Sequence, residues 1–272
     1  MILQNKNAIV YGAGGSLGGA VAKALAQAGA SVFLTGHQLS SVQKTASEIL
    51  AAGGIAEVHI VDGFDAKAIN NHLDKVKEKA GTVDISYNAV GIEVKQNMPL
   101  VEMEMNDFVN PITSTLQTQF LTATAAARVM MKQGYGVILS LTATPGGIGY
   151  PYTGGFAAAC CALESFSRNL AIELGVYGVR VVNMRSGGSP DSRIFKTAID
   201  TYPDLMEPVL KKMKEDTILK KLPLMADIAN AAVFLSSDMA SKITGTTIDI
   251  TCGTTAGLNY RVADATFDPG RK

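Results

Sequence analysis

A glycine-rich segment near the N-terminus, between an apolar run and a helical pattern, has the composition of a phosphate-binding loop. The residues whose backbone we expect to hold a diphosphate are Gly12, Gly14, Gly15, Ser16, Leu17 and Gly18. Glycine permits a tight turn and a close approach of backbone to ligand, and the following helix supplies free N–H groups and the positive end of its dipole. Because the loop joins the first predicted strand to the first predicted helix, we favour dinucleotide binding over a purely structural glycine turn.

Short apolar runs alternate with helical patterns along the whole chain. The predicted strands are residues 8–11, 31–35, 58–61, 85–87, 137–141, 180–183 and 247–250. The predicted helices are residues 19–27, 40–52, 66–80, 114–133, 157–174 and 226–236. Strands that are apolar throughout are buried on both faces, and helices between them provide the crossovers of a parallel sheet. We therefore expect an α/β protein: one doubly wound domain over residues 1–272, with a seven-stranded parallel sheet between two helical layers, in the Rossmann-type arrangement.

Two segments depart from this alternation. Residues 188–222 are rich in Pro, Met, Lys and Asp, and they predict a helical excursion above the sheet. The apolar side of that excursion would suit a small-molecule ligand, or would pack on the core of the domain itself. Residues 254–272 are predicted to form a polar tail.

Charge and composition argue against several classes of function. Lys plus Arg and Asp plus Glu number 24 each, so the charge balance does not indicate a nucleic-acid partner. Apolar residues make up 47% of the chain, but no apolar run is long enough for a membrane span. The residues before the first strand are too few and too polar for a signal peptide. The three cysteines form neither a metal-ligand pattern nor a disulfide framework, so we expect a cytoplasmic protein without a metal site.

Several motifs occur in a fixed order along the chain. The glycine loop begins with Tyr-Gly at residues 11–12, residues 88–91 read Asn-Ala-Val-Gly, and residues 178–183 read Gly-Val-Arg-Val-Val-Asn. A further stretch over residues 227–245 ends in Ile-Thr-Gly. These motifs resemble those of the short-chain dehydrogenase/reductase family over nearly the whole chain. The resemblance implies the fold of that family and a bound NAD or NADP.

The resemblance also assigns residues to the cofactor. It implies that the Asp62 carboxylate meets the adenine and that the site is completed by Gly63, Asn88, Ala89 and Gly187. The chain departs from the family at Ser16, which replaces the middle glycine of the loop, and at Ala89, which replaces an asparagine.

The end of the second predicted strand bears on the choice between NAD and NADP. An acidic residue at this position favours NAD, and a basic one suits the 2′-phosphate of NADP. The chain has no acidic residue there, and His37 falls where many NADP-using relatives carry arginine. We therefore favour NADP over NAD, although His37 could equally be an exposed loop residue.

The resemblance further implies a catalytic set that this chain lacks. The positions of the family's asparagine, serine, tyrosine and lysine are occupied in this chain by Thr115, Ala143, Phe156 and Cys160, respectively. Phenylalanine has no proton to transfer, cysteine has no fixed positive charge, and alanine has no hydroxyl to orient a carbonyl. Loss of a positioned acid costs roughly 10²–10⁴ in rate. The ketone/alcohol chemistry usual in the family is therefore not expected to run here by its usual route.

Other side chains nearby could act instead. Tyr150 and Tyr152 lie in a loop before the helix, where either could turn a phenol inward or serve as a loop or interface aromatic. Cys160 could be a nucleophile, but no neighbouring base supports this, and we favour packing. Arg185 and Asp191 could recognise a ligand or pair with each other.

Three functions remain open. We favour a divergent NAD(P)-dependent oxidoreductase that acts on a small carbonyl or enone-like substrate with a non-standard proton donor. The alternatives are a catalytically silent dinucleotide-binding protein, acting as a sensor or a partner subunit, and lastly non-redox chemistry in the same pocket. The resemblance also implies a homotetramer or a dimer, formed through the helices at residues 114–133 and 157–174.

Overall fold

The computed structural model describes residues 1–257 and contains one parallel sheet of seven strands in the order β3-β2-β1-β4-β5-β6-β7. The strands are β1 Asn7–Tyr11, β2 Ser31–Gly36, β3 Ile55–Ile60, β4 Ile85–Asn88, β5 Gly136–Ala143, β6 Val179–Ser186 and β7 Thr246–Ile250. The strand order reverses between β1 and β4, which lie side by side at the centre of the sheet. The predicted α/β class, the doubly wound topology and the seven parallel strands are confirmed.

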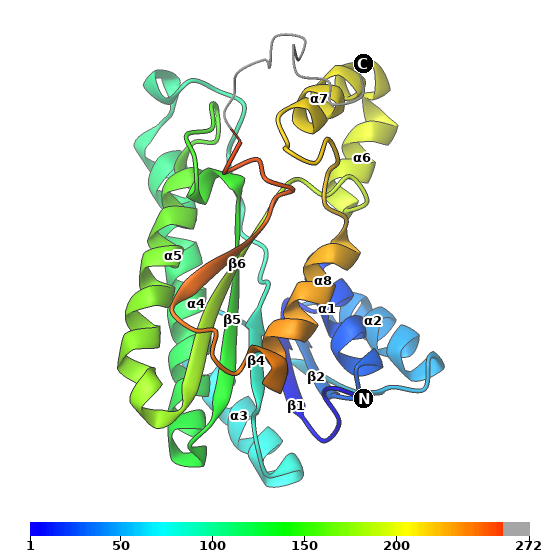
Figure 1. Cartoon of the computed structure of the whole chain (residues 1–272), viewed down its shortest axis with the longest axis vertical. Helices are drawn as coiled ribbons and strands as arrows, with labels where there is room; N and C mark the ends of the chain where they lie inside the picture. Colours follow the sequence, from blue (N-terminus) through cyan, green and yellow to red (C-terminus); the bar gives the residue numbers. More distant parts are fainter. Residues whose placement is uncertain (258–272) are drawn as a thin grey trace, which may run out of the picture.

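Helices cover both faces of the sheet (Figure 1). One apolar core lies between the sheet and α1 Ser16–Gln27, α2 Leu39–Ala51 and α8 Met225–Ser236. A second core lies on the other face, under α3 Ala66–Ala80, α4 Met105–Gln133 and α5 Gly155–Leu174. Four short 3₁₀ turns complete this part of the chain: η1 Leu100–Glu102, η2 Thr144–Gly146, η3 Gly175–Tyr177 and η4 Asp238–Ala240. All six predicted helices are present.

Helix α4 begins at Met105, nine residues before the predicted start at 114. The added part of the helix contains Pro111, although proline inside a helix removes a backbone hydrogen bond. Pro111 is buried, and its ring packs so closely against Gly155 of α5 that a Cβ on that glycine would lie 2.8 Å from the proline Cγ. This packing offsets the lost bond.

Strands β5 and β6 also run further than predicted. The predicted strands end at residues 141 and 183. In the structure the Asn183 amide donates to the Thr142 hydroxyl at 2.8 Å, and the ladder continues to the pair Ala143↔Ser186. The carboxyl ends of these two strands therefore present ordered side chains at the edge of the sheet where ligands bind in open α/β folds.

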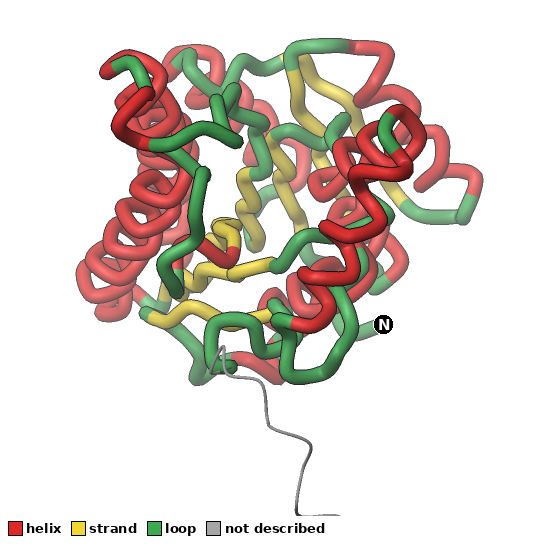
Figure 2. The backbone as a smooth tube through the Cα atoms, turned by 90° about the horizontal axis from the view of Figure 1, so that it is seen from above, coloured by secondary structure: helices red, strands yellow, loops and turns green. Residues whose placement is uncertain are grey.

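The predicted excursion at 188–222 contains two helices, α6 Arg193–Thr201 and α7 Pro203–Glu215. They lie beyond the carboxyl ends of the strands (Figures 1 and 2), and neither helix contains a fully buried residue. The excursion thus forms a lid over one end of the sheet. Of the predicted polar tail, residues 258–272 lie outside the described residues. Within residues 1–257, no helix combines the length and the apolarity that crossing a bilayer requires.

His72 of α3 is buried against His59 of β3, and the centroids of the two rings are 4.6 Å apart. Among the described residues, neither ring nitrogen of His72 has a hydrogen-bond partner. Burial lowers the pKa of His72 to about 3, with further lowering by His59 and Lys75 and an opposing effect of Glu57. The imidazole is therefore neutral in the folded protein.

Acid is expected to destabilise the protein through His72. The unfolded chain takes up a proton below pH 6.5, whereas the folded chain resists protonation down to about pH 3. This contribution to stability is complete above about pH 6.5 and is lost as the pH falls, by on the order of 3 kcal/mol at about pH 4. The free energy of unfolding of His72→Leu, measured with urea, is expected to lack this part of the pH dependence. The variant Asn71→Leu, on the same helix, should retain it. Identical pH dependence in both variants would contradict the assignment.

Candidate active site

The loop between β1 and α1 depends on close backbone contacts. Gly12 has φ +72°, and a Cβ there would lie 2.4 Å from the carbonyl oxygen of Ala89. A Cβ on Gly18 would lie 2.3 Å from the carbonyl oxygen of Gly12. The pairing of Tyr11 with Asn88 in the parallel ladder brings these two loops together. The loop can therefore turn tightly only because glycine occupies both positions.

The N-terminus of α1 is open. Its N-cap is Gly15, and no side chain caps the first turn. The Ser16 hydroxyl accepts a hydrogen bond of 3.0 Å from the backbone N–H of Arg193, the first residue of α6. Gly14 lies against α2, where its Cβ would meet the Ser41 Oγ at 2.3 Å. Uncapped N–H groups at the end of a helix dipole, bordered by a surface without side chains, fit a diphosphate.

The remaining predicted cofactor residues follow the carboxyl ends of several strands, except for Leu17, which lies at the start of α1. Exposed Asp62 follows β3 and accepts a hydrogen bond of 2.9 Å from the Phe64 N–H, and His37 is exposed after β2. The buried Gly63 touches the Thr118 hydroxyl and Val90, where a Cβ would lie 2.8 and 3.0 Å away. Leu17 and Gly187 are half-buried, and Gly187 packs on Pro223.

The Asn88 side chain connects β4 to α4 through hydrogen bonds. Its side-chain amide donates to the hydroxyls of Thr118 and Thr122, at 3.3 and 2.9 Å, and its Oδ1 accepts from the Val90 N–H at 2.9 Å. Both the amide nitrogen and the amide oxygen of Asn88 are therefore already hydrogen-bonded within the protein. Asn88 thus fixes the loop that contains Ala89.

The structure brings together two of the four positions predicted for the reaction centre. The backbone of Ala143, at the end of β5, lies close enough to the Cys160 thiol on α5 to lower its pKa. Phe156 lies one helical turn before Cys160 and is half-buried. Thr115 lies half-buried on α4, and no described residue is hydrogen-bonded to its hydroxyl. Burial raises the pKa of Cys160 to about 11, so the thiol is uncharged at neutral pH and is not an activated nucleophile.

Tyr150 and Tyr152 lie in the loop between η2 and α5. Their side chains are 37% and 58% exposed, and among the described residues neither hydroxyl is hydrogen-bonded. Tyr152 has φ +59°, and its carbonyl accepts a hydrogen bond from the Asn97 N–H at 2.8 Å. The loop is thus attached to the segment that follows β4, with both phenols free to reorient.

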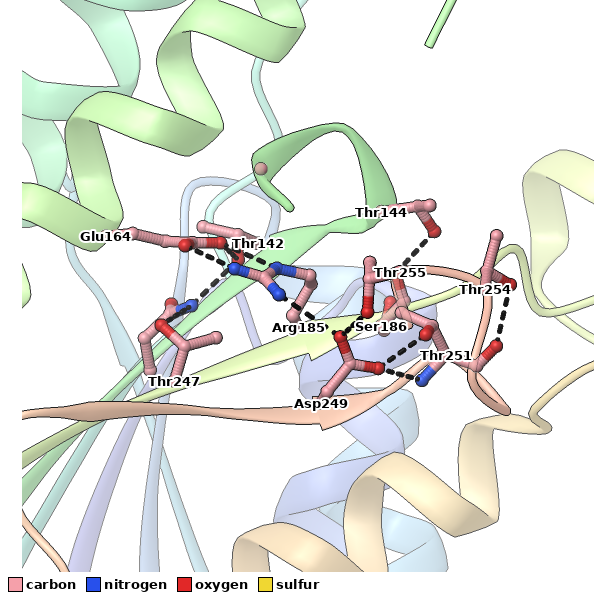
Figure 3. Close-up of polar contacts among 12 residues, drawn as sticks. Thr142, Thr144, Glu164, Arg185, Ser186, Thr247, Asp249, Thr251, Thr254 and Thr255 are labelled. Atoms are coloured by element: carbon pink, nitrogen blue, oxygen red, sulfur yellow. Dashed lines mark hydrogen bonds and ion pairs between the residues drawn. The ribbon is translucent and has the colours of Figure 1, made fainter. Parts of the chain in front are cut away.

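An ion-pair network that includes Glu164 and Arg185 lies at the carboxyl ends of β5, β6 and β7 (Figure 3). Arg185 of β6 donates from Nε and Nη2 to the two oxygens of Glu164 of α5, at 2.9 and 2.6 Å. Its Nη1 donates to Asp249 of β7 at 3.1 Å. The side chains of Glu164, Arg185 and Asp249 are 5%, 15% and 30% exposed. Arg185 was predicted to bind a ligand or Asp191, and the pairing with Asp191 is wrong, since the Asp191 carboxylate accepts from the N–H of Met225 at the start of α8.

Hydroxyl and amide groups extend the network on both sides. Thr142 donates to Glu164 at 2.9 Å and accepts from Asn183 at 2.8 Å. The Asn183 Oδ1 accepts from Ser140 at 2.8 Å. At the other end, the Asp249 carboxylate accepts from the backbone N–H and hydroxyl of Thr251 and from the hydroxyl of Thr255. One polar network therefore joins α5, the three strands β5 to β7, and the turn after β7.

Comparison with known proteins agrees with this geometry. The model of a family described as enoyl-(acyl carrier protein) reductase matches residues 12–255. The 3alpha-hydroxysteroid dehydrogenase of Mediterraneibacter gnavus is 31% identical over 252 residues, which cover 92% of this chain and 97% of that protein. The 3-oxoacyl-(acyl-carrier-protein) reductase FabG of Escherichia coli is 30% identical over 253 residues, or 93% and 98% of the two chains.

The chain belongs to the short-chain dehydrogenase/reductase family. Its relatives are oxidoreductases. The crystal structure of levodione reductase superposes with a TM-score of 0.86 at 24% identity and covers 94% of this chain and 100% of that one. A gluconate 5-dehydrogenase from Burkholderia cenocepacia in complex with NADP and tartrate superposes with a TM-score of 0.83 at 21% identity, covering 94% and 97%. These two structures confirm the fold.

Sequence reasoning missed the Glu164 network in this short-chain dehydrogenase/reductase. One signal was present: Asn183 and Arg185 are polar residues in a strand that should be buried on both faces. A buried charge requires a partner of opposite sign. This signal predicts that partners exist, but it does not identify Glu164 and Asp249, which lie 21 and 64 residues from Arg185.

Proposed function

We propose that the protein is an NADP-dependent oxidoreductase that acts on a small carbonyl or enone-like substrate and uses a proton donor other than the usual tyrosine of its family. The observation that carries this proposal is the open N-terminus of α1 behind a loop that closes only with Gly12 and Gly18. Such a cradle fits the diphosphate of a dinucleotide. The exposed His37 after β2, in place of an acidic residue, favours NADP.

Different residues of this chain would bind the cofactor and line the reaction centre. The backbone of the glycine loop would hold the diphosphate, Asp62 and Gly63 would border the adenine, and Gly187 would border the nicotinamide. When bound, the reduced nicotinamide supplies a hydride. Ala143, Phe156 and Cys160 would form an apolar wall that excludes water and offers no proton. A proton for the product would then come from Tyr152, from Tyr150 or from the substrate itself.

Tyr152→Phe tests this donor. If Tyr152 protonates the product, its loss is expected to lower kcat roughly 10²-fold or more, because a positioned acid is removed, with little change in the Kd of NADPH. Oxidation of NADPH would be followed with a panel of enones and ketones, and Kd would be measured by calorimetry with NADPH and with NADH. Tyr135→Phe, at the opposite end of β5, is the matched control and should leave kcat unchanged. An unchanged kcat in Tyr152→Phe would exclude Tyr152 as the donor.

A second function is favoured by the chemistry of the reaction centre. Cys160 is neutral and Phe156 carries no acidic proton, so a protein that binds the dinucleotide without turning it over is consistent with the same structure. Tight binding of NADPH with no oxidation on any substrate of the panel would support this sensor or partner-subunit function.

The outer faces of α4 and α5 suggest how copies of the chain would associate. Phe120 and Ile172 are 53% and 76% exposed, and Phe120 stacks on Phe166 with ring centroids 6.0 Å apart. Exposed aromatic and aliphatic side chains on a helical surface are typical of an interface. We propose that these two helices form the contact of a homotetramer or a dimer.

A further inference from the structure

One face of the lid packs on the rest of the domain. A Cβ on Gly188, in the loop after β6, would lie 2.4 Å from the Cε of Met213 in α7 and 2.8 Å from the Cζ of Phe195 in α6. The two helices therefore rest on that loop through these side chains. Apolar residues elsewhere on α6 and α7 are left for another contact.

A groove of about 750 Å³ lies on a different face of the lid. It is lined by Ile199 of α6, by Met206 and Leu210 of α7, and by charged side chains of both signs. The lining residues of α7 recur every three or four positions from Pro203 to Glu215, so they fall on one face of that helix. The groove therefore follows α7 along its whole length.

The groove is separate from the candidate reaction centre. All of its lining residues fall within residues 199–220, whereas the reaction centre is built from Ala143, Phe156 and Cys160. Its long shape, its apolar side chains and its mixed charges suit a segment of polypeptide, which presents apolar and charged side chains together.

The last described residue, Gly257, lies beside the end of this groove. A Cβ on Gly257 would lie 3.4 Å from the Cγ1 of Ile218 and 3.6 Å from the carbonyl oxygen of Asp216. The N–H of Leu219 donates to the carbonyl of Cys252 at 3.2 Å. Residues 216–219 join the end of α7 to Lys220, which lines the groove. The turn after β7 thus brings the chain to the C-terminal end of α7.

The residues that follow have the length and the pattern to occupy the groove. Fully extended, residues 258–272 reach about 50 Å, whereas the 13 residues of α7 span about 20 Å. Leu258, Tyr260 and Val262 occupy alternate positions, which places three apolar side chains on one side of an extended segment. Acidic and basic residues in the same segment suit a lining of mixed charge.

We infer that residues 258–272 bind in the groove along α7 of the same chain, with their three alternating apolar side chains against its apolar lining. So short a connection from Gly257 gives the segment an effective concentration on the order of millimolar at the groove, so a weak contact suffices to fill it. The contact would stabilise the lid, since movement of α7 would then also expose the apolar side chains of the segment. The inference requires neither a cofactor nor turnover.

Photo-crosslinking of the full chain tests where the segment binds. The photoreactive residue p-benzoylphenylalanine would be placed at position 260 and irradiated in dilute protein, and crosslinked peptides would be identified by mass spectrometry. Crosslinks to residues 199–220, in a band at the mass of one chain on a denaturing gel, are expected. The same crosslinks in a band at the mass of two chains would overturn the inference in favour of a second copy. Crosslinks only to other residues, or none, would overturn it as well.

Hydrogen exchange tests whether the segment stabilises the lid. In Tyr260→Asp the amides of α7 should exchange roughly tenfold faster than in the natural chain, the change expected when one apolar side chain is no longer buried. Asn259→Asp adds the same charge on the opposite side of an extended segment and should leave exchange unchanged. Equal exchange in all three proteins would contradict the inference.

A substitution in the groove completes the test. Leu210→Asp places a charge in the apolar lining and should reduce the yield of the crosslink from position 260 at least several-fold. Leu205→Asp, on the same helix, changes a residue that is 68% exposed and outside the groove, so it should retain the yield. An equal yield in both variants would count against binding in the groove. If Leu210→Asp does not fold, the crosslinks and the exchange of the variants at residues 259 and 260 still decide.

Discussion

Gly18→Ala is expected to weaken dinucleotide binding by roughly 100-fold or more, equivalent to about 3 kcal/mol. The new Cβ would lie 2.3 Å from the carbonyl oxygen of Gly12 and 2.9 Å from its carbonyl carbon, so the start of α1 and the turn after β1 must move apart. That movement takes the N–H groups of the first helical turn away from the diphosphate. Calorimetry with NADPH measures the change.

Gly175→Ala is the matched control for this substitution. Gly175 ends α5 with φ −59°, and nothing lies within 4 Å of the position of an added Cβ. The same methyl group should therefore change neither binding nor stability appreciably. Thermal unfolding would show that Gly18→Ala is still folded at the temperature of the titration. An affinity for NADPH within twofold of the natural chain would overturn the assignment of the loop.

Glu164→Ala is expected to lower the free energy of unfolding by about 3–5 kcal/mol, because it leaves a buried guanidinium with only part of its compensation. Glu164 accepts from Arg185 twice and from Thr142 once, and its side chain is 5% exposed. Urea unfolding at pH 7 measures the loss. A change below about 1 kcal/mol would mean that water hydrates the pair, as it does at a surface.

Two comparisons separate burial from the ion pair as such. Glu48 forms a pair of similar length with Lys23, at 2.7 Å, but both side chains are 43% exposed, so Glu48→Ala should cost under about 1 kcal/mol. Replacing both partners, Glu164→Leu with Arg185→Leu, should cost less than Glu164→Ala alone, since the one carboxylate then left without a cation, Asp249, is 30% exposed and keeps its hydrogen bonds to Thr251 and Thr255.

The sequence predicted the sheet and the glycine loop well because both depend on local patterns. Apolar runs and helical periodicity identified all seven strands, and the parallel register then placed the end of β1 beside the end of β4. The contact between Gly12 and Ala89 follows from that register. Element ends were predicted less well: β3 runs over Ile55–Ile60 instead of 58–61, and α4 begins before Pro111, whose ring is buried against α5.

The ion-pair network of Glu164, Arg185 and Asp249 was not predictable in the same way. Glu164 lies on a helix with a clear apolar stripe, and nothing in its neighbours indicates a buried carboxylate. Its partner Arg185 belongs to a strand that follows in the chain, and Asp249 lies 64 residues further on. Pairing between such positions is set by the strand order, so a single sequence predicts the existence of partners at most.

The hydrogen bond between Ser16 and Arg193 connects residues 177 positions apart. One end is the first residue of α1, and the other is the first residue of α6, where the lid begins. If two ligands each alter this hydrogen bond, each changes the affinity for the other by the same factor, since such linkage is reciprocal. If a dinucleotide binds at the start of α1 and a substrate binds under the lid, this one hydroxyl would couple the two affinities.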